Sequence, residues 1–264
     1  MCRRRGGEAS PKPNQKTIAA AFHIPVPSFM SAMPANANYR IGKFLAHAGL
    51  CSRRDAANFL NSHEVIYEGN RIHELNFHLS PDAIILVNGQ PVRLNQSQIV
   101  LLNKPPGYVC THKEQKNQKS IFRLLPHEMS RFFYAGRLDE ESRGLVILSN
   151  DGDLVFNLTH PTRETTKIYH VHVSRPLSEI EILKITNGIW SKKEKLQVDN
   201  IRPLLNPANY EIEIHEGKNR EIRRIFDALF LQVNDLLRIK IGEYSIDGIT
   251  EGNYRIISSH TKEP

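Results

Sequence analysis

The sequence predicts an α+β protein, and three observations lead to that prediction. Apolar residues at positions 41, 44, 45 and 48 recur with the spacing of an amphipathic helix. An apolar run over residues 83–87 leads into Asn88-Gly89, a pair typical of β-hairpin turns. Residues 167–173 and 210–215 alternate between apolar and polar, as half-buried strands do. Helices and strands are therefore expected along the same chain.

Composition limits the class of protein. The chain has 264 residues, of which 40% are hydrophobic, and no apolar run approaches the length of a membrane span. The three cysteines, Cys2, Cys51 and Cys110, are too few and too far apart for a disulfide framework or a Cys-x-x-Cys metal pair. We therefore expect a soluble, cytoplasmic protein of one or two domains.

The charge suggests a polyanionic partner, although much of it lies in one segment. The net charge is +7 and the sequence pI is about 9.3. Residues 1–38 hold five Lys or Arg and one Glu, which is +4 of that +7. Because this segment is rich in Pro, Ala, Ser and Asn and has no sustained period, we expect a disordered basic tail. Its prolines disfavour the amphipathic helix of a transit peptide.

Residues 39–97 are expected to form a compact first module of two helices and a small sheet. The first helix covers residues 41–48, and the second follows at Ser52, which makes a capping box with Asp55. Arg53 and Arg54 would then lie in the first turn of the second helix, beside free backbone N–H groups. That arrangement suits a phosphate, although an Arg-Arg pair is also common on a solvated surface.

A polar loop between two apolar runs is the strongest candidate for a site. Residues 133–135 and 144–148 have the composition of buried strands. Between them the chain opens on Gly136 and carries the carboxylates of Asp139, Glu140 and Glu141 beside two arginines. Since desolvated charges are costly unless they are paired or used, this loop is either a solvated hairpin tip or a chemical site.

Two further strands carry polar residues. The strand over residues 99–102 ends in Asn103-Lys104 and a rigid Pro-Pro-Gly turn, where Lys104 either contacts a phosphate or is solvated. In the strand 167–173, Tyr169 lies on the apolar face and His170 and His172 on the other. The histidines lack a third ligand at suitable spacing, so we expect no metal site there.

The last candidate segment begins a helix at residues 216–226. Apolar residues at 222, 225, 226 and 229 form its core stripe, with Arg223 at the edge, where a guanidinium requires a carboxylate. Gly217-Lys218 lacks the other residues of a nucleotide phosphate loop. Before this segment, a helix is expected over 177–189, and the basic connection around Lys192-Lys193 has no assignment.

Four ordered stretches resemble the RsuA/RluB-type family of ribosomal RNA pseudouridine synthases. They are Asn103-Lys104-Pro105 with Gly107, then Gly136-Arg137-Leu138-Asp139 with Ser142, Gly144-Leu145 and Asn150-Asp151-Gly152, then Lys167-x-Tyr169, and finally residues 217–226. Residues 40–45, 48–54 and 88–89 resemble the S-four-type RNA-binding domain. Phe230 stands where the family usually has glycine, so this helix must close in another way.

The resemblance implies a fold and a reaction. It implies an S-four-type module over residues 39–97 and a catalytic domain over 98–264, with a largely antiparallel mixed sheet and a central cleft. The implied reaction converts a uridine that leaves its stack to pseudouridine, without cofactor or metal. Asp139 would be essential, as nucleophile or base, Tyr169 would stack on the base, and Arg223 would pair with Asp139.

The same resemblance, together with the basic residues of the chain, gives an expected RNA-contacting set. Its members are Arg40, Lys43, Ser52, Arg53, Arg54, Lys104, Arg137, Lys167, Asn219, Arg220 and Arg224.

The expected partner is ribosomal RNA, free or in an assembling subunit, and the expected state is a monomer. Residues 219–224 resemble the large-subunit branch of the family, whereas residues 103–111 resemble the small-subunit branch. Other possibilities are a ribosome-assembly factor that binds without catalysis and a metal-dependent nuclease or glycoside hydrolase that uses Asp139 with Glu141.

Overall fold

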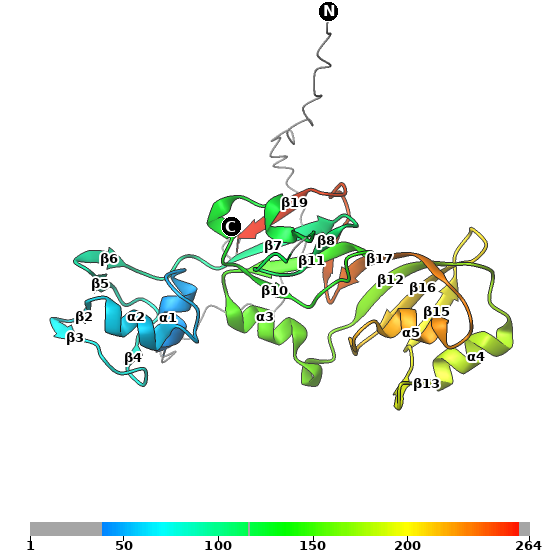
Figure 1. Ribbon diagram of the computed structural model, residues 1–264, viewed down its shortest axis with the longest axis horizontal. Helices are drawn as coiled ribbons and strands as arrows, with labels where there is room; N and C mark the ends of the chain where they lie inside the picture. Colours follow the sequence, from blue (N-terminus) through cyan, green and yellow to red (C-terminus); the bar gives the residue numbers. More distant parts are fainter. Residues whose placement is uncertain (1–38, 116, 259–264) are drawn as a thin grey trace, which may run out of the picture. The chain divides into compact units, whose positions relative to one another are not determined.

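The computed structural model describes residues 39–115 and 117–258, so the expected tail lies outside the described residues (Figure 1). No helix within these ranges is long and apolar enough to cross a membrane. The buried apolar side chains form two clusters, one drawn from residues 39–87 and the other from residues 100–236. The clusters lie on either side of residue 97, and the domain boundary there stays a prediction.

The first cluster is enclosed by two helices and a small sheet. Helices α1 (Ile41–His47) and α2 (Ala56–Ser62) supply the helical part. The sheet has the order β3-β2-β5-β6, and β1 pairs with β4. The Asn88-Gly89 turn joins β5 to β6 with φ values of 50° and 78°, as the hairpin signal predicts. The strands are β1 (Tyr39–Arg40), β2 (Val65–Tyr67), β3 (Asn70–Arg71), β4 (His78–Leu79), β5 (Ile85–Val87) and β6 (Gln90–Val92).

The second helix begins later than predicted. Residues 53–55 form a turn, and α2 starts at Ala56. The Ser52 hydroxyl donates to Asp55 Oδ2 at 2.5 Å, and the Asp55 N–H donates to Ser52 Oγ at 3.2 Å. The serine and aspartate therefore close the turn that precedes the helix. The predicted capping box over the first helical turn is wrong, because that turn lies three residues further on.

One mixed sheet organises the second cluster. Its strand order is β15-β16-β12-β17-β11-β7-β19, with β10 added beside β11 and β18 beside β17. Only the β11–β17 pair is parallel among the pairs of this described sheet, which confirms the largely antiparallel arrangement. The strands are β7 (Gln98–Lys104), β10 (Phe133–Ala135), β11 (Arg143–Ser149), β12 (Lys167–Val173), β15 (Asn200–Pro203), β16 (Asn209–Ile214), β17 (Val233–Ile241), β18 (Tyr244–Ser245) and β19 (Tyr254–Ser258).

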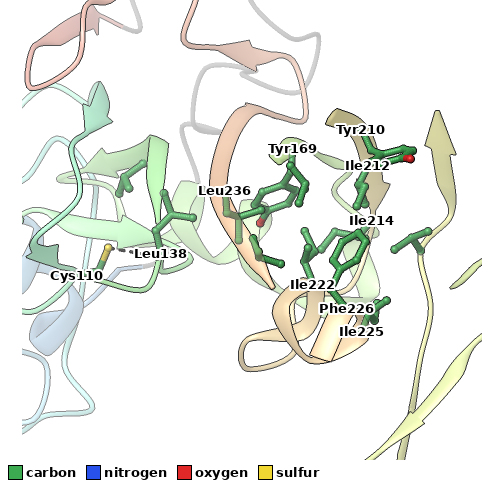
Figure 2. Close-up of a cluster of buried hydrophobic side chains, with 14 of the residues drawn as sticks. Cys110, Leu138, Tyr169, Tyr210, Ile212, Ile214, Ile222, Ile225, Phe226 and Leu236 are labelled. Atoms are coloured by element: carbon green, nitrogen blue, oxygen red, sulfur yellow. Dashed lines mark hydrogen bonds between the residues drawn. The ribbon is translucent and has the colours of Figure 1, made fainter. Parts of the chain in front are cut away.

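Helix α5 (Glu221–Asp227) packs on this sheet with the stripe that the sequence predicts. Figure 2 shows its apolar side chains pointing toward residues of β16, β12 and β17. The contacting set is Ile222, Ile225 and Phe226 from the helix and Ile212, Ile214, Tyr169 and Leu236 from the strands. The helix closes with Phe230 in the left-handed region at φ 58°, and the Leu231 N–H donates to the Phe226 carbonyl at 3.0 Å. A residue that is not glycine thus takes the glycine position.

Two more helices and a hairpin complete the second part. Helix α3 (Gly152–Thr159) is capped by Asp151, and α4 (Glu179–Asn187) begins with a capping box between Ser178 and Glu181. The unassigned basic connection is a hairpin of β13 (Ile189–Ser191) and β14 (Glu194–Leu196), with Lys192 and Lys193 at its turn. The remaining short elements are β8 (Tyr108–Val109), which pairs with β9 (Lys119–Ser120), and the turns η1 (Ile121–Leu124), η2 (His127–Met129) and η3 (Pro161–Arg163).

Candidate active site

The loop over residues 136–142 connects two paired strands. β10 and β11 are antiparallel, with Phe133 opposite Ser149 and Ala135 opposite Ile147, so both ends of the loop are fixed. Behind the loop, the Leu138 N–H lies 3.5 Å from the Cys110 thiol, the contact drawn as a dashed line in Figure 2. Leu138 points into the core, and the next residue, Asp139, keeps 29% of its side chain exposed. Leu138 thus anchors the loop in the core beside the partly exposed Asp139 carboxylate.

A cleft of about 1030 Å³ opens beside this loop. Asp139, Tyr169 and Arg223, the three predicted catalytic residues, all line it. Further lining residues come from the segments 109–118, 158–167 and 214–222, together with Asp199 and with Leu236 and Arg238 on β17. Its size reaches the upper end of the range of roughly 300–1,000 Å³ for small-molecule sites, so a single nucleoside fits inside.

Lys104 is fully buried beneath the loop over residues 136–142 and binds its backbone. Its ammonium donates to the carbonyls of Ser142 at 2.6 Å, Pro105 at 3.0 Å and Glu140 at 3.3 Å. Burial lowers the pKa of Lys104 to about 8, with a smaller contribution from the positive charge of Arg238. A phosphate cannot reach this ammonium while the loop is in place, so the predicted RNA contact of Lys104 does not fit the structure.

Arg223 also serves the base of the loop. Its side chain is buried and donates to the Ser142 hydroxyl at 3.1 Å and the Val233 carbonyl at 3.2 Å, while Nε lies 3.5 Å from Glu141. The guanidinium that approaches Asp139 belongs to Arg220, with Nη1 3.5 Å from Oδ2. The predicted pairing of Arg223 with Asp139 is therefore corrected.

The local backbone explains why Arg220, and not Arg223, approaches Asp139. Arg220 precedes α5 with a left-handed φ of 50°, which turns its side chain toward the loop, where it also meets Glu141 at 2.5 Å. Arg223 lies within the helix on the edge of its buried stripe, and so it reaches the strand end beneath the loop. The stripe indicated burial correctly, but periodicity does not reveal which carboxylate a guanidinium reaches.

Arg238 is a site residue that the sequence reasoning missed. It is 2% exposed, donates from Nε to the Leu145 carbonyl at 2.8 Å, and has Nη1 within 3.4 Å of the Tyr169 hydroxyl and 3.5 Å of the Arg137 carbonyl. The available signal was a charged residue inside the apolar run Leu236-Leu237-Arg238-Ile239. One buried guanidinium thus joins β11, β12 and the aspartate loop.

Gly144 allows this strand arrangement. It pairs with Arg238 at the parallel crossing of β11 and β17 and has a φ of 108°. A Cβ atom at this position would lie 2.2 Å from the Arg238 backbone oxygen, which is far inside contact distance. The glycine of the Gly-Leu motif is therefore required by close backbone approach.

The other predicted RNA contacts in this part of the chain divide into two groups. Lys167 donates to three carbonyls, among them His215 at 2.8 Å, and burial lowers its pKa. Arg224 is held by the Ser191 carbonyl at 2.7 Å and by Glu194 at 2.9 Å. These two side chains are used within the protein. By contrast, Arg137, Asn219 and Arg220 are exposed and line the cleft.

The predicted contacts in the first part of the chain are also mixed. Lys43 forms an ion pair with Asp153 and lies 4.1 Å from the centre of the Tyr39 ring. Arg53 has Nη2 3.7 Å from the same Asp153. Arg40, Ser52 and Arg54 are exposed, and within the described ranges neither of these two arginines forms an ion pair. Their contacts with RNA stay predictions.

The side chains that line the cleft include acidic, basic and aromatic ones. Within the described ranges, no group of three or more His, Cys, Asp or Glu residues is placed to hold a metal ion. The cleft is lined by the Asp139 carboxylate and further acidic side chains, by the Tyr169 ring and by several guanidinium groups.

Comparison with known proteins identifies relatives over nearly the whole described chain. The family model described as RNA pseudouridylate synthase matches residues 98–228. An RNA pseudouridine synthase of Rickettsia felis is 33% identical over 243 residues, which cover 85% of this chain and 99% of that protein. The dual-specificity RNA pseudouridine synthase RluF of Escherichia coli is 30% identical, covering 84% of this chain and 77% of its own.

A third relative and a solved structure agree with these two. The ribosomal large subunit pseudouridine synthase B of Bacillus subtilis is 29% identical over 84% of this chain and 93% of its own. A crystal structure of a pseudouridylate synthase superposes with a TM-score of 0.58 at 27% identity, covering 83% of this chain and 96% of that one. With the cleft and the Gly136–Asp139 motif, these relationships show that the chain belongs to the RsuA/RluB-type RNA pseudouridine synthases.

Proposed function

We propose that this enzyme isomerises one uridine of large-subunit ribosomal RNA to pseudouridine in the cytoplasm, as a monomer, on free or assembling ribosomal RNA. The Bacillus subtilis relative is named for the large ribosomal subunit, and the Escherichia coli relative is named as dual-specificity. The run at residues 219–224, in which Asn219 and Arg220 line the cleft, is the part of the chain that resembles the large-subunit branch.

The observation that carries the proposal is the partly exposed Asp139 carboxylate in a cleft of about 1030 Å³, faced by Tyr169. A uridine inside a helix cannot reach Asp139, so it must leave its stack, which costs a few kcal/mol and favours loop or bulge positions. The cleft replaces the lost stacking by surrounding the base.

Asp139 acts on the sugar, either as a nucleophile toward C1′ or as a base, so that the C1′–N1 bond can break. The Arg220 guanidinium, with Nη1 3.5 Å from Asp139 Oδ2, helps to orient this carboxylate toward the sugar.

Tyr169 supplies the stacking surface for the base, since its ring lies on the cleft side of β12. If its hydroxyl takes part in proton removal, Tyr169→Phe will slow product formation while RNA affinity is kept. An unchanged rate would leave stacking alone as its role.

The test is a map of pseudouridines in ribosomal RNA from cells with and without the gene. We expect one modification in the large-subunit RNA to disappear and to return when purified enzyme is added to that RNA. Loss of a small-subunit modification would transfer the proposal to the other subunit. An unchanged map of both RNAs would reject ribosomal RNA as the substrate.

A further inference from the structure

Arg238 is a buried cation, and its hydrogen bonds use only two of its three guanidinium nitrogens. Its three hydrogen-bond acceptors are the Leu145 and Arg137 carbonyls and the Tyr169 hydroxyl, all of them neutral. Within the described residues, no carboxylate forms an ion pair with it, and its Nη2 atom is buried without a hydrogen-bond partner. A desolvated guanidinium with neutral acceptors alone is costly in free energy, so packing does not explain why an arginine is kept at this position.

Arg238 lies in the wall of the cleft, where a bound substrate is close to it. The residue contributes to the cleft wall together with Asp139 and Tyr169, although its side chain is only 2% exposed. Its Nε and Nη1 groups are fixed by the backbone of β11 and by two groups that line the cleft. Nη2 is the nitrogen of this guanidinium that lacks an acceptor, so one more acceptor would satisfy it.

The reaction produces an acceptor of the required kind. When the C1′–N1 bond breaks, its electron pair leaves with the uracil, and the negative charge is shared between N1, C5 and the oxygens O2 and O4. C5 then forms a new bond to C1′, loses its proton, and N1 gains one, so atoms and electrons balance without a co-reactant. A preorganised cation beside a carbonyl oxygen stabilises the charge at the step where it develops.

We propose that Arg238 is a further catalytic residue, which donates a hydrogen bond from Nη2 to a carbonyl oxygen of the flipped uracil and stabilises the uracil anion during glycosidic bond cleavage. The inference rests on the pseudouridine synthase activity and holds for whichever RNA carries the target uridine. It assigns the base a fixed orientation: one carbonyl faces β17, and the ring lies against Tyr169, whose hydroxyl already accepts from Arg238.

The alternative is that Arg238 only holds the strands and the loop together. Arg143 provides a matched control, because it also joins β11 to β17. Its guanidinium forms two hydrogen bonds with Asp235, at 2.7 and 2.8 Å, and it does not line the active-site cleft. Arg143→Met therefore removes an inter-strand guanidinium without removing a proposed base contact.

The experiment measures single-turnover rates on a short RNA that contains the mapped target position as uridine, 2-thiouridine or 4-thiouridine. Sulfur is a much weaker hydrogen-bond acceptor than oxygen. Wild-type enzyme and Arg143→Met should lose about 10- to 100-fold in rate with one of the two thio-substituted RNAs, as expected for a hydrogen bond to a charged group. Arg238→Lys and Arg238→Met should be slow on uridine and lose little more with that same RNA.

For each variant, the rate on the thio-substituted RNA is divided by the rate of the same variant on the uridine RNA. A smaller folded fraction of the variant lowers both rates equally and therefore does not change this ratio. Equal ratios in wild type and in both Arg238 variants would overturn the proposal and leave Arg238 as a structural residue. So would wild-type rates on uridine for Arg238→Lys and Arg238→Met. If wild-type enzyme does not modify the uridine RNA, the substrate assignment fails, an outcome distinct from failure of the Arg238 contact.

Discussion

At the scale of single residues, the Asp139 carboxylate is positioned through the backbone of its loop. Lys104 binds the carbonyls of Glu140 and Ser142, Arg223 binds the Ser142 hydroxyl, and Arg238 lies within reach of the Arg137 carbonyl. These three buried cations surround a loop whose own carboxylates face the cleft. The loop is therefore held rigid by groups that do not have to take part in the reaction on the sugar.

Arg220 and Arg223 should separate activity from stability. Arg220→Met removes a partly exposed partner of Asp139, so we expect the single-turnover rate to fall about tenfold, equivalent to ~1.4 kcal/mol, with little change in stability. Arg223→Met leaves the Ser142 hydroxyl and Val233 carbonyl without donors and should lower the free energy of unfolding by about 2 kcal/mol. Single-turnover kinetics and urea denaturation measure the two effects. If Arg223→Met lost activity at unchanged stability while Arg220→Met kept its activity, the result would support the predicted pairing of Arg223 with Asp139.

Lys104 should make stability depend on pH. Its pKa is about 8 in the folded protein and has its ordinary, higher value in the unfolded chain. Between these values the unfolded chain binds more protons, so wild-type stability should rise with pH relative to Lys104→Met. The expected gain is about 1 kcal/mol from pH 7 to pH 9. Urea denaturation of both proteins at the two pH values measures it, and parallel changes would show that the ammonium is not desolvated as described.

At the scale of elements, the parallel crossing of β11 and β17 fixes the site. It places Gly144 against Arg238 and thereby sets the distance between the aspartate loop, which ends at β11, and Tyr169 on the strand beyond β17. The remaining pairs of the sheet are antiparallel, and β12 and β16 alternate between buried and more exposed residues. The geometry of the cleft therefore depends on a parallel pairing that alternation in the sequence does not indicate.

Gly144→Ala should disrupt this crossing. The added Cβ would lie 2.2 Å from backbone, so we expect the free energy of unfolding to fall by more than about 3 kcal/mol, or the protein to be insoluble. Gly89→Ala is the control: its φ of 78° is also positive, but no atom lies within 4 Å of the added group, so about 1 kcal/mol is expected. Thermal and urea unfolding measure both. Similar losses in the two variants would show that β11 and β17 can move apart.

The elements that could be predicted are those with local signals. Asp139 and Tyr169 were found through motifs, and the stripe of α5 and the Asn88-Gly89 hairpin through periodicity and turn chemistry. The β13–β14 hairpin was not found, because its turn uses Lys192 and Lys193 at positive φ in place of glycine or asparagine. Arg238 and the burial of Lys104 were not found either, since their partners lie far away along the chain.

At the scale of the whole molecule, the buried apolar side chains of the described residues form two clusters, and the module predicted over residues 39–97 contains the smaller one. The described part of that module carries exposed arginines in the turn before α2. Arg54 forms no ion pair among the described residues, and Arg53 only a long one with Asp153. Both side chains are therefore available to a phosphate backbone.

Arg53→Gln and Arg54→Gln should each weaken RNA binding and lower its salt slope, the slope of log affinity against log salt concentration, by about one unit. Turnover at saturating RNA should stay near wild type, because phosphate contacts position the RNA and do not act on the base. Arg71→Gln, on β3 of the same module, controls for the loss of one charge elsewhere. Affinity measured between low and moderate salt tests this, and unchanged slopes in both variants would reject the module as a backbone-binding element.

The central claim is that Asp139 in the cleft performs the isomerisation, and Asp139→Asn tests it most directly. The amide has nearly the same shape, so the variant should fold and bind RNA as the wild type does, but it can neither attack nor deprotonate the sugar. Purified wild-type and variant proteins are incubated with ribosomal RNA from cells that lack the gene, and pseudouridine at the mapped position is quantified. We expect complete conversion by wild type and none by the variant. Pseudouridine formation by a clean Asp139→Asn preparation at a rate near wild type would contradict the account.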